Sequence, residues 1–530
     1  MADILAKVAE DSARGGFFLI SGTVVSTVIM AISSILIGRL LGPEPYGQYT
    51  LALVIPQLFY LLTDLGINQG VTKFIATFNT RKETDRIIKV LKYSILLKAL
   101  VGVGLFTLNY ALAETLAQLF LQRTDLTPFL QIASFSILFQ AIFTIATSAF
   151  VGLDKTEYSA LTSNVQAIAK TIISIILVLL GLGVAGAIIG YTLSYGAAAG
   201  AGILIIALIL RGKKTTKSHR DTQNDLASLV RYGAPLYLSI LLTGFTPLFK
   251  NFVLANYTTD ADIGNYKAAL NFATLITTLS IPITTALLPA FSKIDSEATS
   301  KIRQFFKHAN KYTTLLILPM TVLLMVYSTQ AVHIIYGSTY QSASLFLATY
   351  CLLYFMVGIG YLTLTSMYNG LGETKTTFTM SLITFSILAT LSPTVTAHYG
   401  VQGLIGTFLL ASLVGTIYGL VKAKRKFTIK FEYQSLAKIY AVSIVSAAPS
   451  ILITHLASPP ELINLVAGAT LYLAIYITLT PLTKIITLSE LESIKKTTEK
   501  IRPLRLTTRP ILNYQQKILK RRTKNAQQQS

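Results

Sequence analysis

Long apolar blocks alternate with short polar connections along almost the whole chain. Each block is long enough to cross a hydrocarbon core of ~30 Å as a helix. The first block is too long for a signal-peptide core and lacks a small-residue cleavage site, so we interpret it as the first helix. The pattern predicts an all-α polytopic membrane protein of about fourteen transmembrane helices, at 16–41, 46–65, 90–113, 128–150, 160–181, 186–210, 232–255, 264–291, 312–336, 343–369, 376–397, 401–421, 437–457 and 462–482.

Composition agrees with a membrane protein. Of the 530 residues, 52% are apolar and 13% are charged, whereas soluble proteins carry about a quarter charged residues. The single cysteine, Cys351, lies in an apolar block and can form no intrachain disulfide, and the five histidines are scattered. We therefore expect neither a metal site nor a cofactor.

Basic residues gather on one side of the predicted membrane. Of the 45 lysines and arginines, 39 lie in the N-terminal segment, the even-numbered connections and the tail, counted with the adjoining helix ends, and two, Arg39 and Arg123, lie in or beside odd-numbered connections. The positive-inside rule then places both termini in the cytoplasm. The net charge of +22 is explained by this asymmetry, so we expect no nucleic-acid partner.

Short motifs recur about 217 residues apart. They are Gly47 to Leu53 with Gly264 to Leu270, Gly152-Leu153 with Gly370-Leu371, and Gly183 to Gly186 with Gly400 to Gly403. A period of six helices predicts two parallel repeats, followed by two C-terminal helices. The expected division is an N-lobe at 1–211, a basic cytoplasmic linker at 212–231, a C-lobe at 232–421, helices 13 and 14 at 437–482, and a basic tail at 483–530 that lies against anionic inner-leaflet lipid.

Two motifs do not indicate chemistry. The run Gly181 to Gly186 matches G-x-G-x-x-G but follows an apolar helix rather than a strand, so we interpret it as a tight turn. The acidic pair Asp260 and Asp262 resembles the metal-binding pair of membrane glycosyltransferases. The outer connections are short, and we therefore expect a solvated loop there.

Four lysines lie inside the predicted helices, where a charge costs ~2.5–3.5 kcal/mol and usually faces a cavity. Lys170 is the most central, on a polar stripe with Ser163, Gln166 and Ser174. We interpret it as a cavity cation, with a lysine paired inside the bundle as the alternative. Lys98 is closer to a cytoplasmic end and is expected to extend its ammonium to the interface.

Further polar stripes follow three other helices. Lys250 continues one that contains Thr243 and Thr246, and Lys267 begins one with Asn271 and Thr274. Spacings of three and four residues place each set on one helix face. Lys267 is near the outer interface and could instead extend into water. A third stripe holds Gln57, Tyr60 and Asp64.

Arg39 and Asp64 end the first two predicted helices, and Asp64 could have a purely structural partner. No acidic residue lies in the middle of a predicted helix. A basic interior suits an anionic substrate such as phosphate or pyrophosphate, which lysine binds as a point charge.

The chain also resembles a known family. Gly38 to Pro43, Tyr46 to Tyr49 and Asp64 to Ile67 look like the opening signature of the polysaccharide-biosynthesis flippases of the multidrug/oligosaccharidyl-lipid/polysaccharide (MOP) exporter superfamily. Leu287 to Ser292 and Gly370 to Lys375 are similar to two later family segments. The ordered set covers helices 1–12.

The resemblance implies a multi-pass cell-membrane transporter, not an enzyme. It would flip oligosaccharides linked to polyisoprenyl phosphate or pyrophosphate from the inner to the outer leaflet by alternating access, for cell-surface polysaccharide or glycan assembly. Glycosyltransferases or a polymerase of the same pathway would be partners. Carried over from the family, the cavity candidates are Arg39, Asp64, Lys170, Lys250 and Lys267, beside Gln57, Gln166 and Asn271 from the stripes. The alternatives are a cation-coupled multidrug exporter and a membrane glycosyltransferase or polymerase.

Overall fold

A computed structural model describes residues 2–211, 222–295, 297–457, 460–498 and 502–529, and this part of the chain contains helices and no strands. The predicted linker, 212–231, lies partly outside the described residues. The first ten α-helices are α1 (Ala2–Leu41), α2 (Pro43–Ala52), α3 (Val54–Leu62), α4 (Ile67–Thr80), α5 (Thr84–Ala111), α6 (Ala113–Leu116), α7 (Thr127–Gly152), α8 (Thr156–Leu177), α9 (Gly183–Leu210) and α10 (Thr222–Tyr257).

Ten more α-helices follow, and four short helical turns connect some of the twenty. The later helices are α11 (Asp260–Ser292), α12 (Thr299–Val326), α13 (Ser328–Tyr336), α14 (Ala343–Phe355), α15 (Thr363–Gly370), α16 (Thr374–Phe427), α17 (Tyr433–Ala457), α18 (Glu461–Leu482), α19 (Leu488–Thr498) and α20 (Arg502–Gln529). The short turns are η1 (Ala117–Leu121), η2 (Thr124–Leu126), η3 (Val178–Leu182) and η4 (Met356–Ile359).

Nine helices in the described residues are long and apolar enough to cross a membrane, or eleven if each of two bent pairs counts as one span. Two of the nine, Thr156–Leu210 and Thr374–Phe427, have 55 and 54 residues, about twice the length that one crossing needs. The chain is therefore a polytopic membrane protein. The number of fourteen helices and the sidedness of the termini stay predictions.

Glycines break both of these double-length helices. Gly181 and Gly183 have φ angles of 89° and 50°, and Gly400 has a φ angle of 56°. Residues with a side chain rarely adopt such angles, so glycine allows the chain to reverse there. The tight turn predicted at Gly181 to Gly186 is confirmed, because this segment joins α8 to α9 without any strand.

Close backbone contacts support the internal duplication. A Cβ atom on Gly47 would lie 1.9 Å from the carbonyl oxygen of Asp260, and one on Gly264 would lie 1.8 Å from that of Pro43. Both glycines and both contacted residues are related by the same offset of 217. The two repeat-equivalent segments, at the starts of α2 and α11, thus contact each other reciprocally.

The chain forms two compact units. The first consists of Met1–Thr274, Ile335–Phe346 and Ser381–Ala411, and the second consists of Leu275–Ile334, Leu347–Met380 and Ser412–Ser530. These units are defined by compactness, whereas the predicted lobes are defined by duplication. The lobe boundaries therefore stay a prediction.

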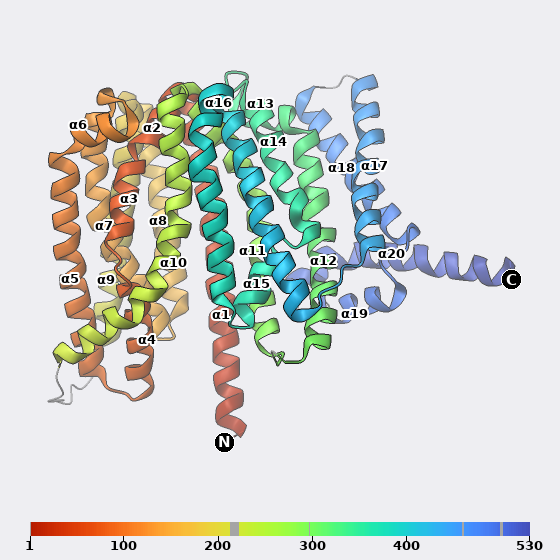
Figure 1. Ribbon diagram of the computed structural model, residues 1–530, viewed down its shortest axis with the longest axis horizontal. Helices are drawn as coiled ribbons and strands as arrows, with labels where there is room; N and C mark the ends of the chain where they lie inside the picture. Colours follow the sequence, from red (N-terminus) through yellow and green to blue (C-terminus); the bar gives the residue numbers. More distant parts are fainter. Residues whose placement is uncertain (1, 212–221, 296, 458–459, 499–501, 530) are drawn as a thin grey trace. The chain divides into compact units, whose positions relative to one another are not determined.

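In the first unit, α5 packs on α7, α7 on α9 and α9 on α8 (Figure 1, orange shades). The predicted second helix, 46–65, extends further than expected. It consists of α2 and α3, breaks after Leu62, and continues as α4 to Thr80 after a bend of 46°. Leu65 and Gly66 have positive φ angles at this break. Asp64 consequently lies at the break and not at a cytoplasmic helix end.

In the second unit, α12, α17 and α18 pack together, and α20 packs against α18. Leu512 and Leu519 of α20 are buried, and Gln515 donates a hydrogen bond to the Ile477 carbonyl at 3.2 Å. The tail thus uses its apolar positions for contacts with its own unit. The predicted contact of its basic residues with anionic lipid is not tested by these contacts.

Candidate functional site

A cavity of about 330 Å³ lies inside the first unit, between α3, α7, α9, α10 and α11. We call it the lysine cavity because Lys250 and Lys267 line it and none of its lining residues carries a carboxylate. Its other polar lining residues are Gln57, Tyr60, Gln140, Tyr191, Tyr195, Asn251 and Tyr266. Positive charge and phenol or amide groups together form a surface suited to an anion.

Lys250 and Lys267 approach this cavity from two consecutive helices. Each is seven residues from the α10–α11 turn, near the ends at Tyr257 and Asp260. At 1.5 Å per residue this is ~10 Å along the helix. The Lys250 ammonium lies 4.1 Å from the centroid of the Phe408 ring, a distance at which the face of the ring attracts the cation. Lys267 faces the cavity, so its side chain is directed inward and not to the outer interface.

Lys170 lies beside the lysine cavity, on α8. It is 4% exposed, and its ammonium lies 5.8 Å from the centroid of Tyr191, a cavity residue. Lys267 is close enough for its charge to repel those of Lys170 and Lys250. The structure therefore places the three lysines near one another, two of them in the cavity lining and Lys170 beside it.

The three candidate amides take two different positions. Gln57 lines the lysine cavity and donates a hydrogen bond to the Tyr191 hydroxyl at 3.3 Å. Gln166 and Asn271 line a second cavity instead. Tyr191 and Tyr195 were not among the predicted site residues, although their spacing of four residues on α9 places them on one helix face.

Arg39 lies apart from the lysine cavity. Its side chain is exposed at the end of α1 and donates a hydrogen bond to the Ile335 carbonyl at 3.3 Å. Arg123, the other basic residue on the predicted outer side, forms an ion pair of 2.7 Å with Asp260. Asp260 is 7% exposed, so the expectation of a solvated loop is wrong for this residue.

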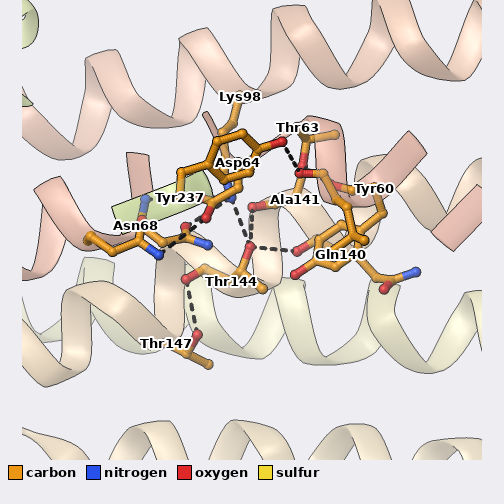
Figure 2. A network of polar contacts seen from close by, with 12 residues as sticks. Tyr60, Thr63, Asp64, Asn68, Lys98, Gln140, Ala141, Thr144, Thr147 and Tyr237 are labelled. Atoms are coloured by element: carbon orange, nitrogen blue, oxygen red, sulfur yellow. Dashed lines mark hydrogen bonds and ion pairs between the residues drawn. The ribbon is translucent and has the colours of Figure 1, made fainter. Parts of the chain in front are cut away.

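Asp64 is also separate from the cavity, in a network of polar contacts (Figure 2). Its carboxylate lies 3.5 Å from the Lys98 ammonium and accepts a hydrogen bond from the Asn68 backbone N–H at 3.1 Å. Lys98 donates further hydrogen bonds to Asn68 Oδ1 at 2.9 Å and to Thr144 Oγ1 at 3.1 Å. The Asp64 carboxylate thus accepts a backbone N–H where α3 and α4 separate, and Lys98 compensates its charge.

The expectation that Lys98 extends to the interface is wrong. The side chain is fully buried, with 14 residues of α5 before it and 13 after it. A lysine so deep in the bundle needs a partner, because an isolated buried charge is very unfavourable. Asp64 and the polar oxygens supply it.

The second unit contains a lysine of the same kind, which the predicted boundaries left outside a helix. Lys311 lies within α12 and is 3% exposed. Its ammonium pairs with Glu490 at 2.9 Å and with Glu432 at 3.8 Å. The missed signal was the length of α12, which begins at Thr299 and not at residue 312.

No group of three or more histidine, cysteine or acidic residues that could hold a metal ion occurs in the described ranges. The chemistry that the lysine cavity offers is reversible binding of an anion by lysines, phenols and amides.

A family model with the description "Polysaccharide biosynthesis protein" matches residues 12–295. Stage V sporulation protein B of Bacillus subtilis is 22% identical over 371 residues, which are 65% of this chain and 71% of that protein. A Shigella dysenteriae protein named "Putative O-antigen transporter" is 25% identical over 266 residues, or 50% of this chain and 64% of that protein.

A solved structure also has this fold. The lipid II flippase MurJ, in an inward closed conformation, has a TM-score of 0.70 and 20% identity over 88% of this chain and 99% of its own. The family model covers more than half of the chain. The chain belongs to the polysaccharide biosynthesis protein family.

Proposed function

We propose that this protein flips oligosaccharides linked to a polyisoprenyl phosphate or pyrophosphate from the inner to the outer leaflet, by alternating access, for cell-surface polysaccharide or glycan assembly. The observation that carries the proposal is the convergence of Lys170, Lys250 and Lys267 on a cavity without a lining carboxylate. The similarity to a lipid II flippase supports the same class of substrate.

Each candidate residue has a proposed role. Lys250 and Lys267 contact the phosphate, Lys170 adds positive charge behind Tyr191, and Gln57 orients the Tyr191 hydroxyl. Arg39 and Asp64 have contacts outside the cavity, so we assign them a structural role.

The membrane potential favours transport in this direction. Moving one negative charge outward across 100 mV, with the inside negative, is favourable by ~2.3 kcal/mol. An anionic head group could therefore be driven without a separate coupling ion.

The two alternatives fit the cavity less well. A cationic drug would need a carboxylate at the binding site, and the lysine cavity has none among its lining residues. A glycosyltransferase that uses a metal ion would need the acidic pair at 260–262, but Asp260 is already paired with Arg123.

Reconstitution tests the transport activity directly. Purified protein in liposomes should move a fluorescent polyisoprenyl-pyrophosphate-linked sugar between leaflets, measured by a membrane-impermeant quencher, faster than protein-free liposomes do. An inside-negative potential should accelerate outward movement. Equal rates with and without protein would contradict the proposal, and elongation of the sugar would favour the polymerase.

We also propose that both termini face the cytoplasm of the cell membrane, with lobes at 1–211 and 232–421 and pathway glycosyltransferases or a polymerase as partners. Cysteines can be introduced at Lys424 and Thr259, which are both exposed. A membrane-impermeant thiol reagent should label the cysteine at 424 only from the cytoplasm and the cysteine at 259 only from outside. Cys351 is buried and gives little background. Labelling from the opposite sides would show that the proposed topology is inverted.

A further inference from the structure

A second cavity, of about 300 Å³, also lies within the first unit, between α1, α7, α8 and α11. No charged side chain lines it. Seven of its lining residues carry a hydroxyl or an amide, namely Ser26, Thr27, Ser34, Ser163, Gln166, Asn271 and Thr274. It therefore differs from the lysine cavity in charge while remaining polar.

Four of the five hydroxyl groups that line this second cavity donate their protons to their own helices. Each bonds to a backbone carbonyl three or four residues earlier, at 2.7–3.1 Å: Ser26 and Thr27 to Thr23, Ser163 to Ser159, and Thr274 to Leu270. A hydroxyl oxygen whose proton is committed in this way can still accept a hydrogen bond. These four residues thus present acceptors to the cavity.

The donor groups of the two amides are also occupied by bonds within the protein. Gln166 donates from its Nε2 atom to Ser194 Oγ at 3.1 Å. Asn271 donates from its Nδ2 atom to the hydroxyls of Tyr46 and Tyr336, at 2.9 and 2.8 Å. Their donors are held by the surrounding helices, so the amide oxygens are the groups left for a ligand. The lining is rich in acceptors and poor in donors.

Such a lining selects its ligand by hydrogen-bond type. A phosphate group offers mainly acceptors, and would lose hydration there without gaining donors. An ammonium group would find no carboxylate among the lining residues. A sugar offers several O–H donors with no net charge, and the Phe143 ring in the same lining can cover the apolar face of a sugar ring.

The position of this cavity connects it to the lysine cavity. Phe143 lines the neutral cavity and Tyr195 lines the lysine cavity, and their ring centroids are 5.7 Å apart. On α8, Gln166 is one turn from Lys170, and on α11, Asn271 is one turn from Lys267. Two helices therefore each carry a lysine toward one cavity and an amide toward the other.

We infer that the neutral cavity is a glycan subsite, which binds the sugar residues next to the phosphate of the transported lipid. This inference rests on the proposed function, because it assigns the sugar and the phosphate of one substrate to neighbouring cavities.

Two probes of equal charge test the subsite: farnesyl pyrophosphate capped by a methyl ester on its terminal phosphate, and farnesyl-pyrophosphoryl-N-acetylglucosamine, each titrated calorimetrically into the full-length protein. The methyl ester removes the additional negative charge of the free pyrophosphate, so that the two probes differ in the sugar alone. The sugar-bearing probe should bind more tightly. The double substitution Thr27→Val and Thr274→Val should remove about tenfold of that advantage, the effect of two neutral hydrogen bonds, and leave the affinity for the methyl-capped probe unchanged. Thr171→Val, a matched control on α8 whose hydroxyl bonds to Ala167, should change neither affinity.

The outcomes separate the subsite from the proposed function. If the methyl-capped probe binds but the sugar adds nothing, or if the double variant weakens both probes equally, the glycan subsite is wrong. If neither probe binds, the proposed function fails as well. Should the double variant not accumulate, Ser163→Ala removes a single hydroxyl from the lining. It should lower the sugar advantage about threefold, and an unchanged advantage would overturn the subsite.

Discussion

Lys98 and Lys170 are both buried lysines in helices of the first unit, but their surroundings differ. Lys98 has the Asp64 carboxylate at 3.5 Å and two oxygen acceptors at 2.9 and 3.1 Å. Lys170 has the ring of Tyr191 at 5.8 Å, and no carboxylate within ion-pair distance among the described residues. The first charge is compensated by the protein, and the second can be compensated by an anion that arrives.

Lys311 extends the comparison to the second unit. It lies on α12 and pairs with Glu490 and Glu432, as Lys98 on α5 pairs with Asp64. Both helices are third in their predicted repeat. A lysine with a carboxylate partner stabilises its own bundle, whereas a lysine without one has no structural reason to remain. The predictions below test this distinction.

Lys98→Met should have the largest effect on stability. It leaves the Asp64 carboxylate in the protein interior without its counter-charge, which costs ~3–5 kcal/mol for a buried pair. We expect little protein in the membrane and a much lower melting temperature. Adding Asp64→Asn should restore most of the lost stability, because the double variant leaves no unpaired charge from this ion pair. Normal accumulation of the single variant would show that the pair is not structural.

Lys170→Ala should instead lower transport and leave stability nearly unchanged. Removing a charge that no carboxylate compensates need not destabilise the bundle, so accumulation should be near normal. Flipping should fall ~10–100-fold, because the charge attracts the phosphate through space, by ~1.4–2.8 kcal/mol at an effective dielectric constant of about 20. Lys170→Arg should retain part of the activity, since the charge is kept while its geometry changes. Flipping at the normal rate would refute the anion-binding role, and failure to accumulate would indicate a structural partner.

The pair in the second unit should respond to pH. Burial raises the pKa of Glu490, but hydrogen bonds from the Thr487 backbone N–H and the Lys311 ammonium outweigh it and lower the pKa to about 2. The folded pKa of Glu490 lies below the ordinary value of 4.5. The ionised carboxylate therefore stabilises the folded protein fully above pH ~4.5, and this stabilisation is lost as the pH falls toward 2. The carboxylate is partly exposed, so we expect ~1 kcal/mol.

Melting curves of the wild type and Glu490→Gln should therefore differ most above pH 5 and converge in acid. Glu492→Gln on the same helix is the matched control, because Glu492 is exposed. A difference that stays constant with pH, or one equal to that of the control, would exclude the Lys311–Glu490 pair as its source.

The smallest effect concerns one hydrogen bond of the Lys98 network. Thr144→Val removes the hydroxyl that accepts from Lys98 and should lower the free energy of unfolding by ~1 kcal/mol, without changing the flipping rate. Thr147→Val is the control, since the Thr147 hydroxyl donates to the Thr144 carbonyl of its own helix. Equal effects of the two substitutions would show that the bond to Lys98 adds nothing.

Periodicity and charge were sufficient for several features of this protein. Blocks of apolar residues predict membrane helices because the bilayer requires a minimum helical length. The motif pairs at an offset of 217 predicted the duplication, which the reciprocal contacts of Gly47 and Gly264 support. The stripes that contain Lys170, Lys250 and Lys267 predicted one polar interior, since helical spacing alone decides which side chains share a face.

The pairing of charges was decided only by the tertiary structure. Lys98 and Asp64 are 34 residues apart in the chain, and Lys311 and Glu490 are 179 apart. No local pattern encodes such contacts, because they depend on how helices pack. The continuation of the second predicted helix as α4, beyond Leu65 and Gly66, was likewise not predicted, because polar residues interrupt the apolar pattern there. The sequence alone therefore identified four of the lysines inside apolar helices, though not Lys311 of α12, and helix packing decided which of them the protein itself neutralises.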